Sequence, residues 1–320
     1  MKKKFDFENI TLIPNYSYVK SRSECETTLK FGPLYFKLPI VPSNMESIID
    51  LSLAIELAKN EYFYIMHRFN VNPVEFTNKM HELGLYSSIS IGVNEDSYTY
   101  IDQFVNENIC PEYITIDIAH GHCIKMKKMV KYIKENLPNT FIIGGNVSTP
   151  DAVEDLQKWG CDAIKCGIGG GSACTTYHST GFGNRGCQAN MILDCSKVAK
   201  VPIIADGSIK EHSDIVKSLV LGASMVMVGG MLSGYEESPG KMVEKDGEKF
   251  KEFWGSASNA QSGKTNRIEG IKKLVPYKNH SIFNKLTQIE ESLQSAISYA
   301  GGNPSNLESL YMVKYCVKMN

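Results

Sequence analysis

Short hydrophobic runs recur at fairly even spacing along the chain and give the main indication of its fold. Each run is largely continuous rather than alternating, which is typical of strands buried on both faces of a parallel sheet. The runs occupy residues 39–45, 63–68, 87–93, 113–119, 141–147, 163–169, 202–208 and 225–231. Helix-like segments lie between them at 47–60, 73–84, 122–136, 150–160, 188–199 and 211–222. Strands that alternate with helices in this way predict an α/β fold, a closed (β/α)8 TIM barrel, with a doubly wound open sheet as the alternative.

Two segments of the chain fall outside the barrel pattern. The chain has 320 residues, whereas a (β/α)8 barrel typically takes about 250 residues, so about 70 are left over. We therefore predict a single barrel domain over residues 1–320, with an N-terminal arm at 1–38 and an insertion at 232–280 after the eighth strand. This surplus is too small for a second full domain.

The insertion is expected to contain a hairpin and a flap. The segment KMVEKDGEKFKEFW (241–254) has Asp246-Gly247 at its centre, a pair that favours a tight hairpin turn. The polar stretch that follows, at 255–270, is rich in Gly, Ser and Lys and is interpreted as a mobile flap over a site. An amphipathic helix at 282–300 follows the insertion.

Composition and charge narrow the class of protein. Hydrophobic residues make up 42% and charged residues 22%, which excludes a disordered chain. The net charge is −1, which argues against a nucleic-acid-coating surface. No stretch approaches the roughly 18 apolar residues of a membrane span. The nine cysteines have neither disulfide-framework nor zinc-ligand spacing, so we expect a cytoplasmic protein with reduced thiols.

The loop after the sixth strand, CGIGGGSACTTYHSTGFG (166–183), contains the first candidate for chemistry. Glycines and Ser172 precede Cys174, so backbone amides can face a ligand without obstruction by Cβ atoms. Oriented amides and a bound cation would favour a thiolate, which makes Cys174 a candidate nucleophile. The alternative is a buried structural cysteine, and we favour that interpretation for the other eight cysteines.

The next two strands end in residues suited to a phosphate group. Asp206-Gly207-Ser208 follows the seventh strand and Gly229-Gly230 the eighth. Loops after strands seven and eight commonly form the phosphate sites of barrels, and Ser172 adds a third adjacent loop. Asp206 would then accept hydrogen bonds from ribose hydroxyls, although a turn-forming aspartate is the alternative.

Other polar residues lie at equivalent strand ends or in the flap. Arg68, Asp117 and Asn146 follow the second, fourth and fifth strands, and each is as consistent with a structural hydrogen bond as with a ligand contact. Glu269 lies in the flap, and a carboxylate that closes over a site loses water, which raises its pKa and suits proton transfer.

These motifs together resemble the IMP dehydrogenase/GMP reductase family. The resemblance rests on GIGGGSACTT (167–176), ADGS (205–208), MVMVGGM (225–231), the flap ending in Glu269-Gly270, and LQSAISYAGG (293–302), and it runs essentially end to end. MHRF (66–69), GYEESPG (234–240) and GSASNAQ (255–261) are similar to the shorter bacterial members of the reductase branch.

The resemblance implies a homotetrameric (β/α)8 barrel that binds a purine 5′-monophosphate and a nicotinamide cofactor. For the reductase branch it implies NADPH-dependent reductive deamination of GMP to IMP and ammonia. Cys174 would displace the 2-amino group and form a thioimidate, while Thr176 and Glu269 would handle the proton of the ammonia. These are small-molecule ligands, and the resemblance implies neither nucleic acid nor a membrane as a partner.

The resemblance also assigns binding roles to particular residues. Nucleotide contacts are implied for Ser172, Asp206, Gly207, Ser208, Gly229, Gly230, Gly255, Ser256, Ala257 and Gly270. Cofactor contacts are implied for Ser21, Arg22, Arg68, Asp117, Ile118, Ala119, Ile168 and Gly169, with Ser21 and Arg22 reaching the cofactor of a neighbouring subunit. A monovalent cation, K+, is implied at Gly169, Gly171 and Cys174. Gly170 departs from the family pattern by replacing the usual proline, and Tyr177 by replacing a basic residue.

Two alternative functions remain open at this point. One is an IMP dehydrogenase that lacks its regulatory insert, but such enzymes usually carry an Arg-Tyr pair in the flap, and none occurs at 255–270. Residues 69–86 also leave no room for the insert that usually follows the second strand. The other is a barrel that binds a purine nucleotide without catalysis, and the joint presence of Cys174, Thr176 and Glu269 speaks against it.

Overall fold

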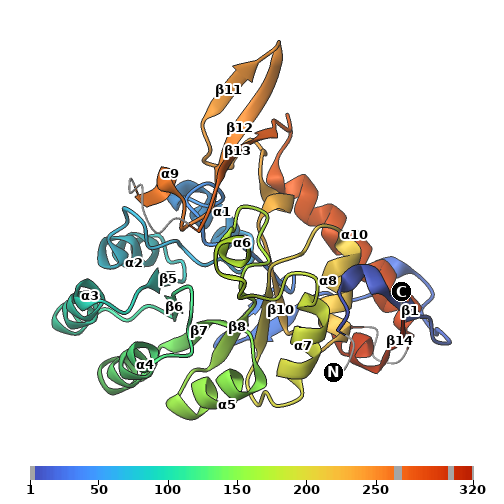
Figure 1. Cartoon of the computed structure of the whole chain (residues 1–320), viewed down its shortest axis with the longest axis horizontal. Helices are drawn as coiled ribbons and strands as arrows, with labels where there is room; N and C mark the ends of the chain where they lie inside the picture. The colour runs from blue at the N-terminus through green and yellow to red at the C-terminus, as the bar shows by residue number, and fades with distance from the viewer. Residues whose placement is uncertain (1–3, 263–268, 302–305, 319–320) are drawn as a thin grey trace.

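A curled parallel sheet surrounded by helices forms the body of the molecule (Figure 1). The computed structural model describes residues 4–262, 269–301 and 306–318. In spatial order the sheet contains β4 (Ile40–Pro42), β10 (Met225–Val228), β9 (Ile203–Asp206), β8 (Ala163–Cys166), β7 (Phe141–Val147), β6 (Tyr113–Asp117) and β5 (Ser88–Ile91). All neighbouring pairs are parallel, so the architecture is TIM-barrel-like, as predicted.

The second predicted strand, at 63–68, is not a strand in the structure. Phe63, Tyr64 and Ile65 are fully buried, as a barrel strand would be. The Met66 N–H donates to the Ser88 carbonyl of β5, at 2.9 Å. However, the Ser88 N–H donates to the Tyr64 hydroxyl, at 3.3 Å. Because a side chain takes this N–H, a regular backbone ladder does not form there, and the segment lies beside β5 without joining it.

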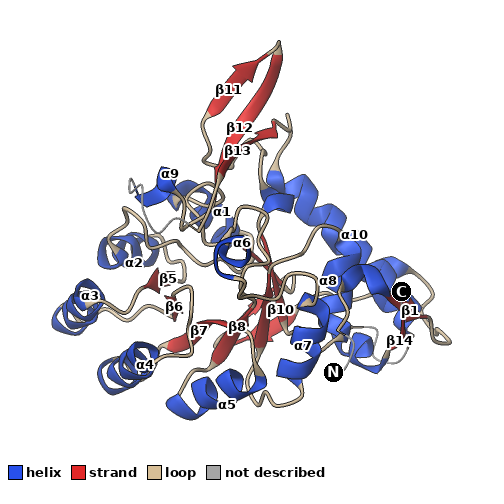
Figure 2. Ribbon diagram, viewed as in Figure 1, coloured by secondary structure: helices blue, strands red, loops and turns tan. Residues whose placement is uncertain are grey.

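Helices follow the strands around the outside of the sheet (Figure 2). They are α1 (Leu51–Lys59), α2 (Pro73–Glu82), α3 (Glu95–Asn106), α4 (Ile124–Asn136), α5 (Pro150–Trp159), α7 (Gln188–Ser196) and α8 (His212–Val220). Helix α5 begins and ends at residues that favour helix ends. The Thr149 side chain caps its first turn, Pro150 begins it, and Gly160 ends it with φ of 112°. Helix α3 lies between the third and fourth predicted strands, where no helix was predicted.

The N-terminal arm closes the end of the barrel where the strands begin. Strand β1 (Ile10–Ile13) pairs with β14 (Lys314–Val317), which joins the two ends of the chain. Strands β2 (Leu29–Phe31) and β3 (Leu34–Phe36) form a hairpin that buries Phe31 and Phe36. These two rings pack in one cluster with Phe63 and with Tyr113 at the start of β6.

The insertion after β10 projects from the barrel as an antiparallel sheet (Figures 1 and 2). The predicted hairpin is confirmed as β11 (Met242–Lys245) and β12 (Glu248–Trp254), with positive φ at Asp246 and Gly247. A third strand, β13 (Lys272–Pro276), pairs with β12 and was not predicted. Short helix α9 (Asn259–Ser262) lies in the flap, and flap residues 263–268 lie outside the described residues.

The C-terminal part of the chain packs back against the barrel. Helix α10 (Ile282–Ala300) matches the predicted amphipathic helix and buries Leu286, Ile289 and Leu293. The 3-10 turn η4 (Leu307–Met312) follows and contacts both α10 and α8. None of the helices in the described residues is long and apolar enough to cross a membrane.

Candidate active site

Three predicted catalytic residues meet in one hydrogen-bonded chain at the carboxyl end of the sheet. Cys174 lies in the loop after β8, Thr176 begins the short helix α6 (Thr176–Thr180), and Glu269 comes from the far end of the flap. The Cys174 thiol donates to Thr176 Oγ1 at 3.2 Å. The Thr176 hydroxyl in turn donates to Glu269 Oε2 at 2.6 Å. A nucleophile, a hydroxyl and a carboxylate in direct contact can transfer a proton between the first and the last.

Backbone contacts hold both stems of the flap against the cysteine loop. The Thr175 N–H donates to the Glu269 carbonyl at 2.8 Å, and the Glu269 N–H donates to the Ala257 carbonyl at 3.0 Å. Gly270 forms bridges to both Cys174 and Ser258. A Cβ at Gly270 would lie 2.9 Å from Ser258 N, so only glycine permits this close approach. The stems therefore fix Glu269 beside Thr176.

The three loops predicted to form a phosphate site converge in the structure. The Ser208 N–H donates to the Gly170 carbonyl at 3.0 Å, which joins the loops after β9 and β8. Ser172 Oγ lies 3.2 Å from the position of a Cβ at Gly230, which brings the loop after β10 alongside. A Cβ at Gly229 would lie 2.9 Å from Ser43 Oγ, after β4. Small residues thus expose backbone amides at one point of the barrel mouth.

A buried lysine, Lys165, connects two of the predicted ligand-binding carboxylates. Its Nζ lies 3.0 Å from Asp117 Oδ1 and 3.1 Å from Asp206 Oδ2. Burial alone would raise the pKa of Asp117, but the charges of Lys165 and Arg68 outweigh burial and hold the pKa below its usual value. Burial likewise acts to lower the pKa of Lys165, and the two carboxylates outweigh it and raise the pKa.

The sequence prediction missed Lys165, although the sequence contains a signal for it. A lysine within the apolar run 163–169 cannot reach solvent from a strand buried on both faces. It must therefore be paired with an acidic group inside the barrel. Asn146, considered only as an ambiguous residue, also belongs to this cluster, because its Nδ2 donates to Asp206 Oδ2 at 2.7 Å.

Some of the other predicted cofactor residues lie at the mouth of the barrel, and others lie on its outer surface. Arg68 Nε donates to the Asp117 carbonyl at 3.2 Å, so it lies at the mouth. Ile118 and Ala119 directly follow β6, and Ile168 and Gly169 lie at the start of the cysteine loop. Ser21 and Arg22, in contrast, are not brought to the mouth of this chain. Arg22 Nη1 donates to Ser295 Oγ of α10 at 3.3 Å, and its guanidinium lies 5.7 Å from the Tyr299 ring centre.

The flap residues expected to contact the base lie at the first flap stem. Gly255 is buried against Ala173, and a Cβ there would lie 2.8 Å from the Ala173 carbonyl. Ser256 and Ala257 follow, and Ala257 is exposed. The first flap stem therefore lies against the cysteine loop, next to Cys174 in sequence, at Ala173.

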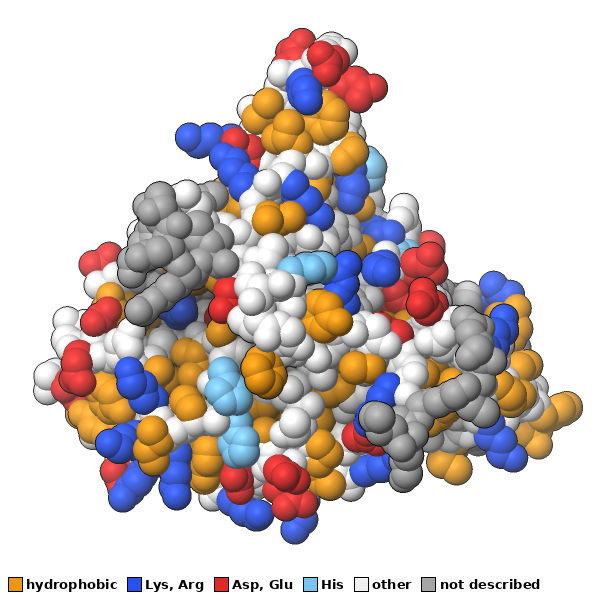
Figure 3. Space-filling view, in the orientation of Figure 1, with side chains coloured by type: hydrophobic (Ala, Val, Ile, Leu, Met, Phe, Trp, Pro, Cys, Tyr) orange, Lys and Arg blue, Asp and Glu red, His pale blue; other side chains and the backbone are white. Residues whose placement is uncertain are grey.

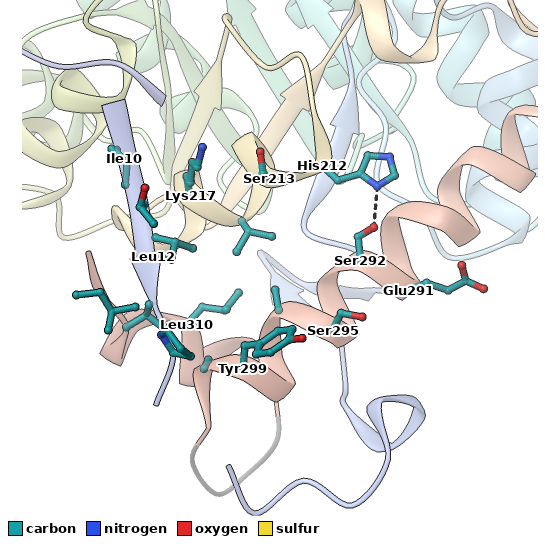
Figure 4. A pocket seen from close by; sticks show the side chains of 17 residues that line it. Ile10, Leu12, His212, Ser213, Lys217, Glu291, Ser292, Ser295, Tyr299 and Leu310 are labelled. Carbon is teal, nitrogen blue, oxygen red and sulfur yellow. Dashed lines mark hydrogen bonds between the residues drawn. The ribbon is translucent and has the colours of Figure 1, made fainter. Parts of the chain in front are cut away.

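A cavity elsewhere in the described part of the chain differs in character from the predicted site. The face in Figure 3 carries basic and acidic side chains intermixed, in line with the net charge of −1. A cavity of about 890 Å³, of a size that suits a small ligand, lies between β1, α8 and α10 (Figure 4). Its wall is largely apolar, and none of the predicted site residues lines it.

The fold and this site together define a TIM-barrel-like protein with a cysteine loop, a flap carboxylate beside it and converging loops after β8, β9 and β10. A family model described as "IMP dehydrogenase / GMP reductase domain" matches residues 4–318, and the chain belongs to this family.

Particular relatives within the family are similar over nearly the whole chain. A protein named GMP reductase from Ligilactobacillus salivarius is 52% identical over 99% of this chain and 97% of its own length. GMP reductases from Lactobacillus delbrueckii subsp. bulgaricus and Bacillus licheniformis are 51% and 50% identical. They are matched over 95% and 98% of their lengths, and over 99% and 100% of this chain.

Proposed function

We propose that this protein catalyses the NADPH-dependent reductive deamination of GMP to IMP and ammonia. The observation that carries the proposal is the contact chain from Cys174 through Thr176 to Glu269, at 3.2 and 2.6 Å. The similarity to proteins named GMP reductase supports the choice of substrate. Neither an IMP dehydrogenase activity nor simple nucleotide binding releases ammonia, so neither would require Glu269 to transfer a proton to it.

The first half of the reaction removes the amino group. Transfer of the thiol proton through Thr176 to Glu269 gives a Cys174 thiolate, which attacks C2 of the purine and pushes an electron pair onto N3. Glu269 then returns the proton to the 2-amino group through Thr176. The C2=N3 double bond re-forms as ammonia leaves, so a thioimidate joins Cys174 to the base.

The second half releases IMP from the enzyme. When bound, NADPH supplies the hydride that C2 receives. The electron pair then expels Cys174 as a thiolate, and C2 of the product carries hydrogen in place of the amino group. The cysteine is regenerated, so Cys174 acts in both halves of the reaction.

The barrel mouth supplies the groups that would hold GMP. The amides of Ser172, Gly207, Gly229 and Gly230 and the hydroxyls of Ser172 and Ser208 would bind the phosphate, because their loops converge. Asp206 would accept from the ribose hydroxyls. The purine would lie against Gly255, Ser256, Ala257 and Gly270 at the flap stems.

A second group of residues at the mouth fits a nicotinamide cofactor. Arg68, Asp117, Ile118, Ala119, Ile168 and Gly169 would border its nicotinamide end, and Arg68 adds a positive charge there. Ser21 and Arg22 would contact the cofactor of a neighbouring subunit in a homotetramer. The contact of Arg22 with α10 supports this role, because it leaves Arg22 outside the mouth of its own chain.

A K+ ion would bind the carbonyls of Gly169, Gly171 and Cys174. The Gly171 carbonyl accepts the Cys174 N–H at 3.0 Å and retains a second lone pair for a cation. We also place the enzyme in the cytoplasm, a proposal supported by its free cysteines.

The proposed activity is tested by absorbance at 340 nm with two pairs of substrates. GMP with NADPH should cause loss of absorbance, and the Cys174→Ala variant should abolish it. An increase with IMP and NAD+ would instead identify a dehydrogenase. No change with either pair would leave a nucleotide-binding protein.

A further inference from the structure

Lys165 reaches across a neighbouring strand because that strand has a glycine at the crossing point. Asp117 of β6 is the register partner of Gly145 of β7, and Gly145 is the register partner of Lys165 of β8. A Cβ at Gly145 would lie 2.6 Å from the Lys165 Cβ. The missing side chain therefore makes room for the lysine to cross β7 toward Asp117.

The Lys165 ammonium is shared between carboxylates from two different strands. The Lys165 side chain is only 4% exposed, and those of Asp117 and Asp206 are 16% and 21% exposed. Asp206 Oδ2 is held by both Lys165 and the Asn146 amide. Its other oxygen, Oδ1, has no hydrogen bond within the described residues, so it is available to accept from a ligand.

We propose that Lys165 is a positioning residue that holds Asp206 for the ribose and Asp117 for the cofactor at the same time. This inference rests on the proposed function, which assigns the two carboxylates to the two ligands. A single ammonium then orients both carboxylates, and couples the geometry of the nucleotide side to that of the cofactor side.

Loss of the ammonium should affect both ligands. In Lys165→Met the two carboxylates lose the cation that lies between them, so they repel each other and rotate apart. The Kd values for GMP and for NADP+ should each rise about tenfold or more, because the carboxylate that contacts each ligand is no longer held in place.

A second substitution separates positioning from general damage to the fold. In Lys165→Met/Asp117→Asn the neighbouring negative charge is gone, and Asn146 still holds Asp206 at 2.7 Å. GMP affinity should therefore recover in the double variant, while NADP+ affinity should stay low. Lys165→Arg should retain part of both affinities, because it keeps a cation.

Calorimetric titration of GMP and NADP+, each alone, tests the inference without relying on turnover. Lys134→Met is the matched control, because Lys134 also pairs with an aspartate, Asp162 at 2.7 Å, but lies outside the mouth. Circular dichroism verifies that each variant is folded.

The possible outcomes distinguish a failure of the role proposed for Lys165 from a failure of the proposed function. Weak binding of both ligands by Lys165→Met, with GMP binding restored by Asp117→Asn, supports the inference. Normal binding of both ligands by Lys165→Met would overturn the inference and leave the proposed function intact. The same holds if Lys165→Met weakens the binding of both ligands and the added Asp117→Asn substitution does not restore GMP binding. Failure of the unsubstituted enzyme to bind GMP and to oxidise NADPH with it would overturn the proposed function and the inference with it. If Lys165→Met does not fold, the Lys165→Arg and double variants decide in the same way.

Discussion

Side chains from two separate parts of the chain form the proposed proton path. Cys174 and Thr176 are close in sequence, but Glu269 reaches them only because the flap stem binds the cysteine loop through the backbone of Thr175. Proton transfer from Cys174 to Glu269 therefore depends on the contact between the cysteine loop and the flap stem.

The proton path predicts similar effects for the two residues that accept the proton from Cys174, namely Thr176 and Glu269. Thr176→Val and Glu269→Gln should each lower kcat about 10²- to 10⁴-fold, because each interrupts proton transfer to the leaving ammonia. The double variant should be scarcely slower than either single variant, because they disable one unit. Steady-state kinetics with GMP measure this. Thr175→Val is the control, since only the Thr175 backbone contacts Glu269. Additive losses would contradict a shared path.

Gly170 and Ser208 form a second pair at the scale of residues. A Cβ at Gly170 would lie 3.1 Å from Ser208 Oγ, and Ser208 itself has φ of 62°, a conformation that favours glycine. The glycine at 170, which replaces the usual proline of the family, thus makes room for the serine hydroxyl.

This pairing predicts a measurable interaction between two substitutions. Gly170→Ala should raise the KM for GMP, because the methyl group displaces Ser208 from the phosphate loops. Gly170→Ala/Ser208→Gly should recover much of the loss, with a coupling of about 1 kcal/mol between the two changes. The KM values of the two single variants and the double variant give this coupling, and strict additivity would disprove the pairing.

Among the elements, the β2–β3 hairpin contributes most clearly to stability. Phe31 is 1% exposed and packs against Phe63, Tyr113 and Phe141 at the closed end of the barrel. Phe31→Ala should lower the free energy of unfolding by about 3–5 kcal/mol, because it leaves a cavity among rings. Tyr35→Ala in the same hairpin, where the ring is 68% exposed, should change it by about 0.5 kcal/mol at most. Urea denaturation measures both, and equal effects would show that the hairpin is not part of the core.

The same elements show which structural features the sequence predicts. Continuous apolar runs with Gly or Asp at their ends predict the barrel strands, because burial on both faces leaves a clear pattern. The run at 63–68 has this pattern but lacks a ladder, since the Tyr64 hydroxyl takes the N–H of Ser88. Helix α3 escapes prediction because its buried face consists of only Ser97, Ile101 and Phe104.

The site is predictable to the extent that its chemistry is local in sequence. The cysteine loop and the phosphate loops are compact motifs, so their residues could be named in advance. The pairing of Glu269 with Thr176 came from the family resemblance, because no spacing rule links residues so far apart. Lys165 was missed because its partners, Asp117 and Asp206, become neighbours only when the sheet curls.

For the molecule as a whole, a buried histidine makes stability depend on pH. Burial lowers the pKa of His67 despite the nearby Glu46 charge, and its Nδ1 accepts the Phe69 N–H at 3.3 Å. The unfolded histidine gains a proton near pH 6.5, whereas the folded one stays neutral to lower pH. Stability is therefore full above about pH 6.5 and falls as pH decreases toward the folded pKa.

This dependence should disappear when His67 is replaced. His67→Asn keeps a hydrogen-bond acceptor and removes the titration, so the free energy of unfolding should fall less between pH 7 and pH 5. Denaturation at a series of pH values measures the slope. His120→Asn, at an exposed position, should leave the slope unchanged. An unchanged slope in His67→Asn would assign the pH dependence to other groups.

The central claim is that the barrel removes the amino group of GMP through Cys174 and reduces the same carbon. It is tested most directly by measuring ammonia release and NADPH oxidation together in one reaction with GMP. The account predicts equal amounts of both, and neither in Cys174→Ala. NADPH oxidation without ammonia, or full activity in Cys174→Ala, would contradict it.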